Sequence, residues 1–142
     1  MAYTAKLLIR DVICVPSDRS VEEAARVMLK ADIGSVIVGT LAKPEGILTE
    51  RDITRRVVAA GLEAARTPIR SVMTAKITSV EASEPLDHVF KILSEAKFRH
   101  LPITEGGKVV GIVSLTDLAK VLQEVYRDDK YLQYFADVVA SR

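Results

Sequence analysis

The chain has 142 residues, of which 49% are hydrophobic, and it carries 20 basic and 19 acidic side chains for a formal net charge of +1. That length is typical of one domain or of two small domains packed together, and the balanced charge gives no electrostatic reason to expect a nucleic acid or an anionic membrane as a partner. The single cysteine, Cys14, excludes a disulfide framework and argues against a cysteine metal site. Without a signal-peptide pattern or an apolar run of about 18 residues, a cytoplasmic protein is expected, and the lack of asparagine beside many charged residues is typical of a thermophile.

Two strings with the same spacing, GILTERD at 46–52 and GIVSLTD at 111–117, indicate an internal repeat. When the chain is shifted against itself by 65 residues, these strings superpose, and the apolar pattern of 7–57 matches that of 72–122 without a gap. The sequence therefore predicts two copies of one structural unit.

The first copy, residues 5–61, reads as strand, helix, strand, strand, helix. The three strands are expected at 12–15, 35–38 and 46–48. The first helix carries its apolar face on Val21, Ala24, Met28 and Ala31. The second helix runs from about 50 to 60 and stops at Gly61, a predicted C-cap.

The second copy, residues 71–125, repeats this order after a linker at 62–70. Its strands are expected at 77–80, 100–103 and 109–113. The apolar residues of its first helix are Leu86, Val89, Phe90, Leu93 and Ala96. The string TEGGK predicts a hairpin turn between the last two strands. Because about 65 residues make a marginal fold alone, we expect a mixed α/β (α+β) protein whose two copies pack their sheets face to face.

The C-terminal segment, residues 126–142, is a candidate for a further helix whose apolar residues cover more than one face. It would either fold back on the core or contact a second subunit.

In each string a hydroxyl residue precedes an aspartate by three positions: Thr49 before Asp52, and Ser114 before Asp117. This spacing is typical of a capping box at a helix start. The same geometry suits a nucleotide, because a helix N-terminus attracts phosphate and a carboxylate can accept both ribose hydroxyls. The glycine that opens each string would let a ligand or a neighbouring backbone approach closely. For Thr49 and Asp52, capping alone is the competing interpretation.

The doubled pattern of glycine, two aliphatic residues and [ST]-x-x-D, each preceded by β-α-β, resembles the tandem CBS domain pair, or Bateman module. The strings IRSVMTAKITSVEASEPLDHVFKIL at 69–93 and FRHLPITEGGKVVGIVSLTDL at 98–118 fit the same family, so the resemblance covers about residues 5–125. It implies a stand-alone pair, similar to those of archaea and bacteria, with β-α-β-β-α repeats related by a pseudo-twofold axis and two clefts between them.

The resemblance implies that these clefts bind an adenosine compound: AMP first, then ADP or ATP, with S-adenosylmethionine last. It places the ribose on Asp52 and Asp117, and the ribose or phosphate on Thr49 and Ser114. The base would lie against residues near the first β-run of the second copy, namely Met73, Ile77 and Val80.

The two copies differ before their second strand. The second copy has Arg99 and His100 there, which the resemblance places near phosphate, whereas the first has Gly34 and Ser35. We therefore favour a site around Asp117. The competing interpretations are a surface arginine and a partly buried strand histidine. The histidines make no metal site by spacing, and no metal is expected.

The functional hypothesis is a regulatory sensor of adenine nucleotides, hence of cellular energy, which forms a homodimer and acts on an unknown partner protein. An enzyme is not expected, because the sequence shows no nucleophile–base pair, metal cluster or P-loop, and no catalytic cofactor is expected. The alternative is a dimerisation or scaffold module with empty or degenerate clefts. The basic string RDITRR at 51–56 is interpreted as a solvated helix surface and not as a nucleic-acid site.

Overall fold

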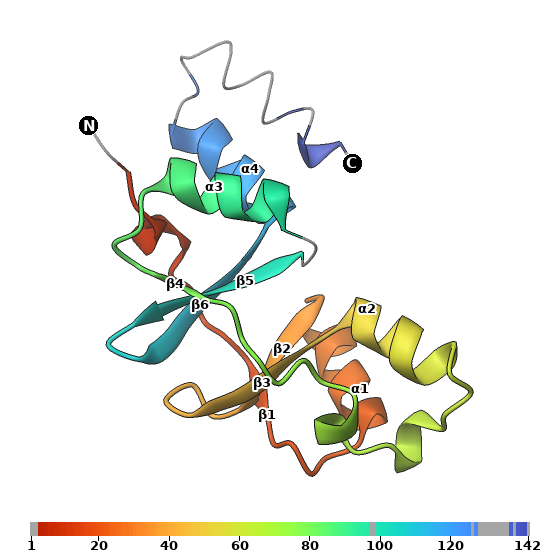
Figure 1. Ribbon diagram of the computed structural model, residues 1–142. Helices are drawn as coiled ribbons and strands as arrows, with labels where there is room; N and C mark the ends of the chain where they lie inside the picture. The colour runs from red at the N-terminus through yellow and green to blue at the C-terminus, as the bar shows by residue number, and fades with distance from the viewer. Residues whose placement is uncertain (1–2, 97–98, 126, 128–136, 138, 142) are drawn as a thin grey trace. The chain divides into compact units, whose positions relative to one another are not determined.

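The computed structural model describes residues 3–96, 99–125, 127, 137 and 139–141 (Figure 1). The chain divides into two compact units. We call residues 11–78 with 107–109 the first-repeat unit, and residues 1–10, 79–106 and 110–142 the second-repeat unit. Each contains a three-stranded sheet, which confirms the predicted mixed α+β class.

The first-repeat unit has the predicted element order. Its elements are β1 (Cys14–Val15), α1 (Val21–Ala31), β2 (Ser35–Gly39), β3 (Pro44–Thr49) and α2 (Glu50–Ile53). The sheet order is β1-β2-β3, with β1 parallel to β2 and β2 antiparallel to β3. The core joins one face of α1 to the sheet, with Val21, Met28 and Leu48 all buried.

Two expectations for the helices of this unit need correction. Ala31, expected on the apolar face of α1, is exposed, since it is the last helical residue before the left-handed Asp32. The second helix is α-helical only at Glu50–Ile53 and continues as a π-helical turn over Thr54–Val58. Gly61 follows with a φ of +73°, as a C-cap glycine requires.

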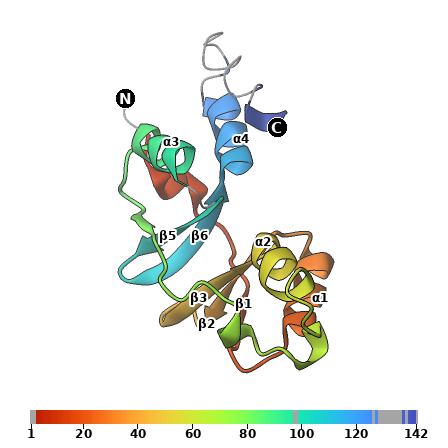
Figure 2. The same ribbon diagram turned by 45° about the vertical axis from the view of Figure 1, so that its right-hand side comes forward.

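The second-repeat unit repeats the order. Its elements are β4 (Val80–Glu81), α3 (Leu86–Glu95), β5 (His100–Glu105), β6 (Lys108–Ser114) and α4 (Leu115–Val125). The sheet order is β4-β5-β6, with β4 parallel to β5. Gly106 and Gly107 form the predicted hairpin turn, and both have positive φ, which suits a two-residue connection. In both views α3 and α4 lie on one side of this sheet (Figures 1 and 2).

The first strand of each repeat is shorter than predicted. The expected strands at 12–15 and 77–80 reduce to Cys14–Val15 and Val80–Glu81, because only these residues pair with the neighbouring strand. Most of the predicted C-terminal helix lies outside the described residues. Within its described part, Val139 is buried against Ala119 of α4, as the folded-back alternative requires. In the part of the chain that is described, no helix has the length and apolar content needed to cross a bilayer.

The residues around the start of each repeat, which we call its leading segment (5–10 for the first repeat and 69–74 for the second), pack in the unit of the other repeat. The 3-10 turn at Ala5–Leu8 begins the first repeat, yet Ala5 and Leu8 are buried in the core of the second-repeat unit. Conversely, Ile69 and Val72 lie at the start of the second repeat and are buried in the core of the first-repeat unit. The repeats of the sequence and the compact units are therefore different divisions of the chain.

Candidate functional site

Both aspartates of the repeated strings cap the helix that follows the last strand. In the second-repeat unit, the Ser114 N–H donates to Asp117 Oδ2 at 3.1 Å, and the Asp117 N–H donates to Ser114 Oγ at 3.1 Å. Thr49 and Asp52 form the same reciprocal pair at 3.0 and 3.2 Å. The capping interpretation is therefore confirmed in both repeats. Capping uses only Oδ2 of each carboxylate, so the other oxygen is left for further contacts.

The glycine of each string lies where a leading segment crosses the sheet. A Cβ atom on Gly111 would lie 2.5 Å from the carbonyl oxygen of Leu8, and one on Gly46 would lie 2.7 Å from that of Thr74. Both distances are too short for any side chain unless the backbone moves. Of the two reasons for a glycine, the structure thus shows the close approach of a neighbouring backbone.

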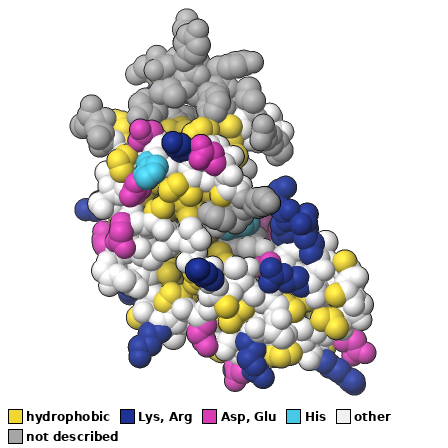
Figure 3. Space-filling model, viewed as in Figure 1, with side chains coloured by type: hydrophobic (Ala, Val, Ile, Leu, Met, Phe, Trp, Pro, Cys, Tyr) yellow, Lys and Arg dark blue, Asp and Glu magenta, His cyan; other side chains and the backbone are white. Residues whose placement is uncertain are grey.

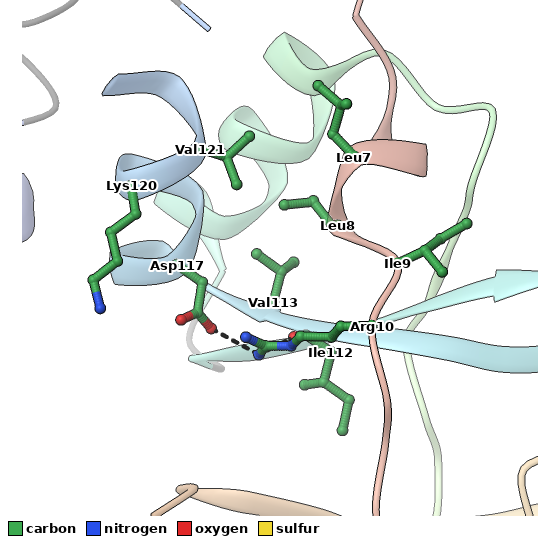
Figure 4. Close-up of a pocket in the computed structure, with 9 residues that line it drawn as sticks. All are labelled: Leu7, Leu8, Ile9, Arg10, Ile112, Val113, Asp117, Lys120 and Val121. Atoms are coloured by element: carbon green, nitrogen blue, oxygen red, sulfur yellow. Dashed lines mark hydrogen bonds and ion pairs between the residues drawn. The ribbon is translucent and has the colours of Figure 1, made fainter. Parts of the chain in front are cut away.

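Where the leading segment crosses the sheet of the second-repeat unit, it leaves a pocket beside Asp117. The volume of this pocket is about 290 Å³, close to the lower end of the range for small-molecule sites (about 300 Å³). Its lining residues come from the N-terminal segment, β6 and α4 (Figure 4). They are Leu7, Leu8, Ile9, Arg10, Ile112, Val113, Asp117, Lys120 and Val121. The pocket thus combines an apolar wall with one carboxylate and two basic side chains.

Arg10 is a polar residue of the pocket that sequence analysis missed. Its Nη2 donates to Asp117 Oδ2 at 3.0 Å and also to the Ile112 carbonyl oxygen. The repeat alignment gives no hint of this contact, because Arg10 aligns with Ala75. The exchange of leading segments brings Arg10 to an aspartate 107 residues away.

Lys120 was also missed, although its spacing offered a signal. It lies three residues after Asp117 on α4, and residues at that spacing share a helix face. In Figure 4 its side chain extends from α4 beside Asp117. The pocket therefore carries two cationic groups against one anionic group.

The pKa of Asp117 is lowered below its ordinary value. Burial is the largest single influence and by itself raises the pKa, but the hydrogen bonds from Ser114 and the charge and hydrogen bond of Arg10 together outweigh it. The side chain is 31% exposed. Asp117 is therefore an ionised hydrogen-bond acceptor at neutral pH.

Asp52 has a different environment in the first-repeat unit. Its side chain is only 13% exposed, and its Oδ1 lies 3.8 Å from Nε of Arg56, one helical turn later. The Nη1 of Arg56 donates to the carbonyl oxygens of Val72 and Met73, at 3.0 and 3.3 Å. Arg56 therefore connects its helical turn, through these hydrogen bonds, to the segment that contains Val72 and Met73.

The other predicted site residues fall into two groups by unit. Arg99 is exposed just before β5, His100 begins β5 half-buried, and Val80 is buried in β4. These three belong to the second-repeat unit and do not line the pocket around Asp117. Met73 and Ile77 are half-buried in the first-repeat unit, the unit of Thr49 and Asp52.

The basic string at 51–56 lies on the surface, as expected. Its arginines, Arg51, Arg55 and Arg56, are all exposed, and Figure 3 shows basic side chains gathered over α2. Elsewhere on that face, acidic and basic side chains are interspersed. Among the described residues, no group of three or more His, Cys, Asp or Glu side chains could hold a metal ion.

Comparisons with known proteins agree with this architecture. The CBS domain-containing protein YhcV of Bacillus subtilis is 30% identical over 119 residues, which are 84% of this chain and 84% of YhcV. A solved structure of an uncharacterized conserved protein from Pyrococcus horikoshii is 32% identical with a TM-score of 0.77, covering 85% of this chain and 92% of the other.

A third solved structure with a similar fold contains ligands. The CBS domain pair of protein MJ0100, in complex with 5′-methylthioadenosine and S-adenosyl-L-methionine, has a TM-score of 0.76 at 24% identity, covering 88% of this chain and 99% of the other. Pairs of this kind are generally regulatory or signal-transduction modules. The family model for the CBS domain matches residues 5–59 and again residues 69–124. The chain therefore belongs to the CBS domain family and carries two CBS domains in tandem.

Proposed function

We propose that this protein is a cytoplasmic adenine-nucleotide sensor, a regulatory module and not an enzyme, which binds AMP, ADP or ATP beside Asp117 and acts on a partner protein. The observation that carries the proposal is the convergence of Asp117, Arg10 and Lys120 on one apolar pocket. Each part of a nucleotide has a chemical counterpart there. The carboxylate suits ribose hydroxyls, the cations suit phosphate, and the aliphatic wall suits a base.

The charges of the pocket support a phosphorylated ligand over S-adenosylmethionine. Arg10 and Lys120 outnumber the single carboxylate of Asp117. S-adenosylmethionine would add a sulfonium cation to a site that already has a net positive charge, whereas a phosphate would be attracted to it. AMP is our first choice because the pocket is small.

We extend the proposal to the other residues that the family pattern suggested. Ser114 would contact ribose or phosphate beside Asp117, and Arg99 and His100 would supply further phosphate contacts. The base would lie against Met73, Ile77 and Val80, and Thr49 with Asp52 would form a second, weaker site. The adenosine ligands of the MJ0100 pair support the ligand class.

Titration calorimetry with AMP, ADP, ATP and S-adenosylmethionine tests the proposal. Asp117→Asn keeps an oxygen for the helix cap but removes the charge, so it should weaken AMP binding by roughly 10- to 150-fold, the value of a charge-assisted hydrogen bond. Asp87→Asn is the matched control, because Asp87 is an exposed acidic residue in the first turn of α3. Equal affinities of the two variants for AMP would refute the site.

A scaffold module with empty clefts is the second candidate. It is favoured by the occupied state of Asp117 Oδ2, which already accepts hydrogen bonds from the helix cap and from Arg10. A lack of binding by all four compounds would support this candidate.

A homodimer is also part of the proposal. Leu29 of α1 is 83% exposed and Val58, after α2, is 69% exposed, and large apolar side chains at such positions favour a protein contact. Sedimentation velocity should show a dimer for the native protein and a monomer for Leu29→Glu. A monomer in both would exclude this contact.

A further inference from the structure

We infer that Arg10 determines the specificity of the Asp117 pocket: it competes with the ribose for Asp117 and then pairs with the phosphate of a nucleotide. This inference rests on the proposed function. It assigns a role to a residue outside the repeated strings, and it predicts selection of nucleotides over uncharged nucleosides.

The first argument comes from the hydrogen-bonding capacity of Asp117. A carboxylate oxygen offers about two lone-pair positions. Oδ2 already accepts one hydrogen bond from the Ser114 N–H and one from Arg10 Nη2, whereas neither of these donors contacts Oδ1. A vicinal diol that donates to both oxygens of the carboxylate must therefore displace Arg10 from Oδ2.

The second argument concerns how readily Arg10 can move. Its side chain is 53% exposed, so its ion pair with Asp117 is partly screened by water and is weak by the measure of exposed pairs. The ionised state of Asp117 does not depend on Arg10 alone, because the hydrogen bond from the Ser114 N–H to Oδ2 also stabilises it. Displacement of Arg10 thus leaves the helix cap intact.

The third argument concerns where the displaced guanidinium would find a partner. Arg10 and Lys120 line the same pocket. A bound nucleotide brings phosphate oxygens that a guanidinium binds strongly, often through two parallel hydrogen bonds. A nucleoside offers no such partner. Arg10 therefore opposes nucleoside binding without compensation, but it favours nucleotide binding.

The experiment compares AMP with adenosine by titration calorimetry in four variants of the full chain. Arg10→Gln should weaken AMP binding by about tenfold and strengthen adenosine binding. Both changes lower the ratio of AMP affinity to adenosine affinity. Lys120→Gln should weaken AMP binding but leave adenosine binding unchanged, because Lys120 forms neither a hydrogen bond nor an ion pair with Asp117. Arg10→Lys, which keeps the charge, should retain most of the preference for AMP.

Arg26→Gln is the matched control. Arg26 is an exposed arginine of α1 whose Nη2 lies 2.5 Å from Glu22 Oε1, outside the pocket. Both affinities should match the native protein. Thermal melts of each variant, followed by circular dichroism, establish that it is folded.

The outcomes separate this inference from the proposed function. An equal loss of AMP and adenosine affinity in Arg10→Gln would mean that Arg10 only supports the fold of the pocket, and an unchanged preference would mean that it sets no specificity. Either result would overturn the inference and leave the nucleotide site standing. Failure of the native protein to bind AMP, ADP or ATP would overturn both.

Discussion

Asp52 and Asp117 occupy equivalent positions in the two repeats, yet the arginine that faces each comes from a different part of the chain. Asp52 faces Arg56, which lies four residues later on the same helical segment. Asp117 faces Arg10, which lies in the leading segment of the other repeat. The two carboxylates make the same helix cap, so the difference lies wholly in the second partner.

With this difference in partners goes a difference in how accessible the two carboxylates are to a ligand. Arg56 is held by the Val72 and Met73 carbonyl oxygens and faces an aspartate that is 13% exposed. Arg10 is held by one carbonyl oxygen and faces an aspartate that is 31% exposed. The carboxylate of the second repeat is thus the more accessible one. Equivalent residues of a repeat therefore need not have equivalent chemistry.

The largest effect is expected at the two crossing points. Gly111→Ala should lower the free energy of unfolding by about 3 kcal/mol, because the new Cβ meets the backbone oxygen of Leu8 at 2.5 Å. Gly46→Ala should cost somewhat less, since its closest atom, the oxygen of Thr74, lies at 2.7 Å. Urea unfolding measures both free energies.

Gly61→Ala is the control for these glycines. It has a positive φ but no atom within 4 Å of its Cβ position, so it should cost about 1 kcal/mol through strain alone. If Gly111→Ala loses no more unfolding free energy than Gly61→Ala, the leading segment can move away from the new Cβ at little energetic cost.

The next largest effect is expected on AMP affinity, which should depend more on Asp117 than on Asp52. Asp117→Asn should weaken AMP binding by roughly 10- to 150-fold, whereas Asp52→Asn should have a smaller effect because Asp52 is less accessible. Calorimetry on both variants checks the order. The reverse order would assign the principal site to the first repeat.

The smallest effect concerns pH. The folded-state pKa of Asp117 is lowered, so its ionised form stabilises the fold above the unfolded pKa of about 3.9, and this contribution is lost as the pH falls through the folded pKa. Asp117→Asn should therefore cost about 1 kcal/mol of unfolding free energy at pH 7 and progressively less below pH ~3.9. Urea unfolding across pH measures this. A cost that does not change with pH would point to the shape of the side chain instead of its charge.

The hydrophobic pattern was enough to predict most elements, because helices and strands differ in the spacing of their buried residues. It located α3 through Leu86, Val89 and Leu93, all of which are buried. It could not show that residues 54–58 form a π-helical turn, or that the first strands are only two residues long. The hydrogen-bond partners of the backbone decide both features, and the spacing of apolar residues does not record them.

The candidate site was only partly predictable for a similar reason. Ser114 and Asp117 were found because they are close in sequence and recur in the repeat. Arg10 was not found, because its contact depends on the exchange of leading segments, a tertiary feature that no local pattern records. The placement of Arg99 and His100 at a phosphate remains a prediction.

The exchange of leading segments also bears on how the chain could be divided. Cleavage between Gly61 and Ile69 would give one fragment without Ile69 and Val72, which complete its core, and another without Ala5 and Leu8. Each fragment would carry the piece that the other needs. Each CBS domain thus contributes residues to the core of the other unit, so that separated halves should recover their structure by complementation and not by folding independently.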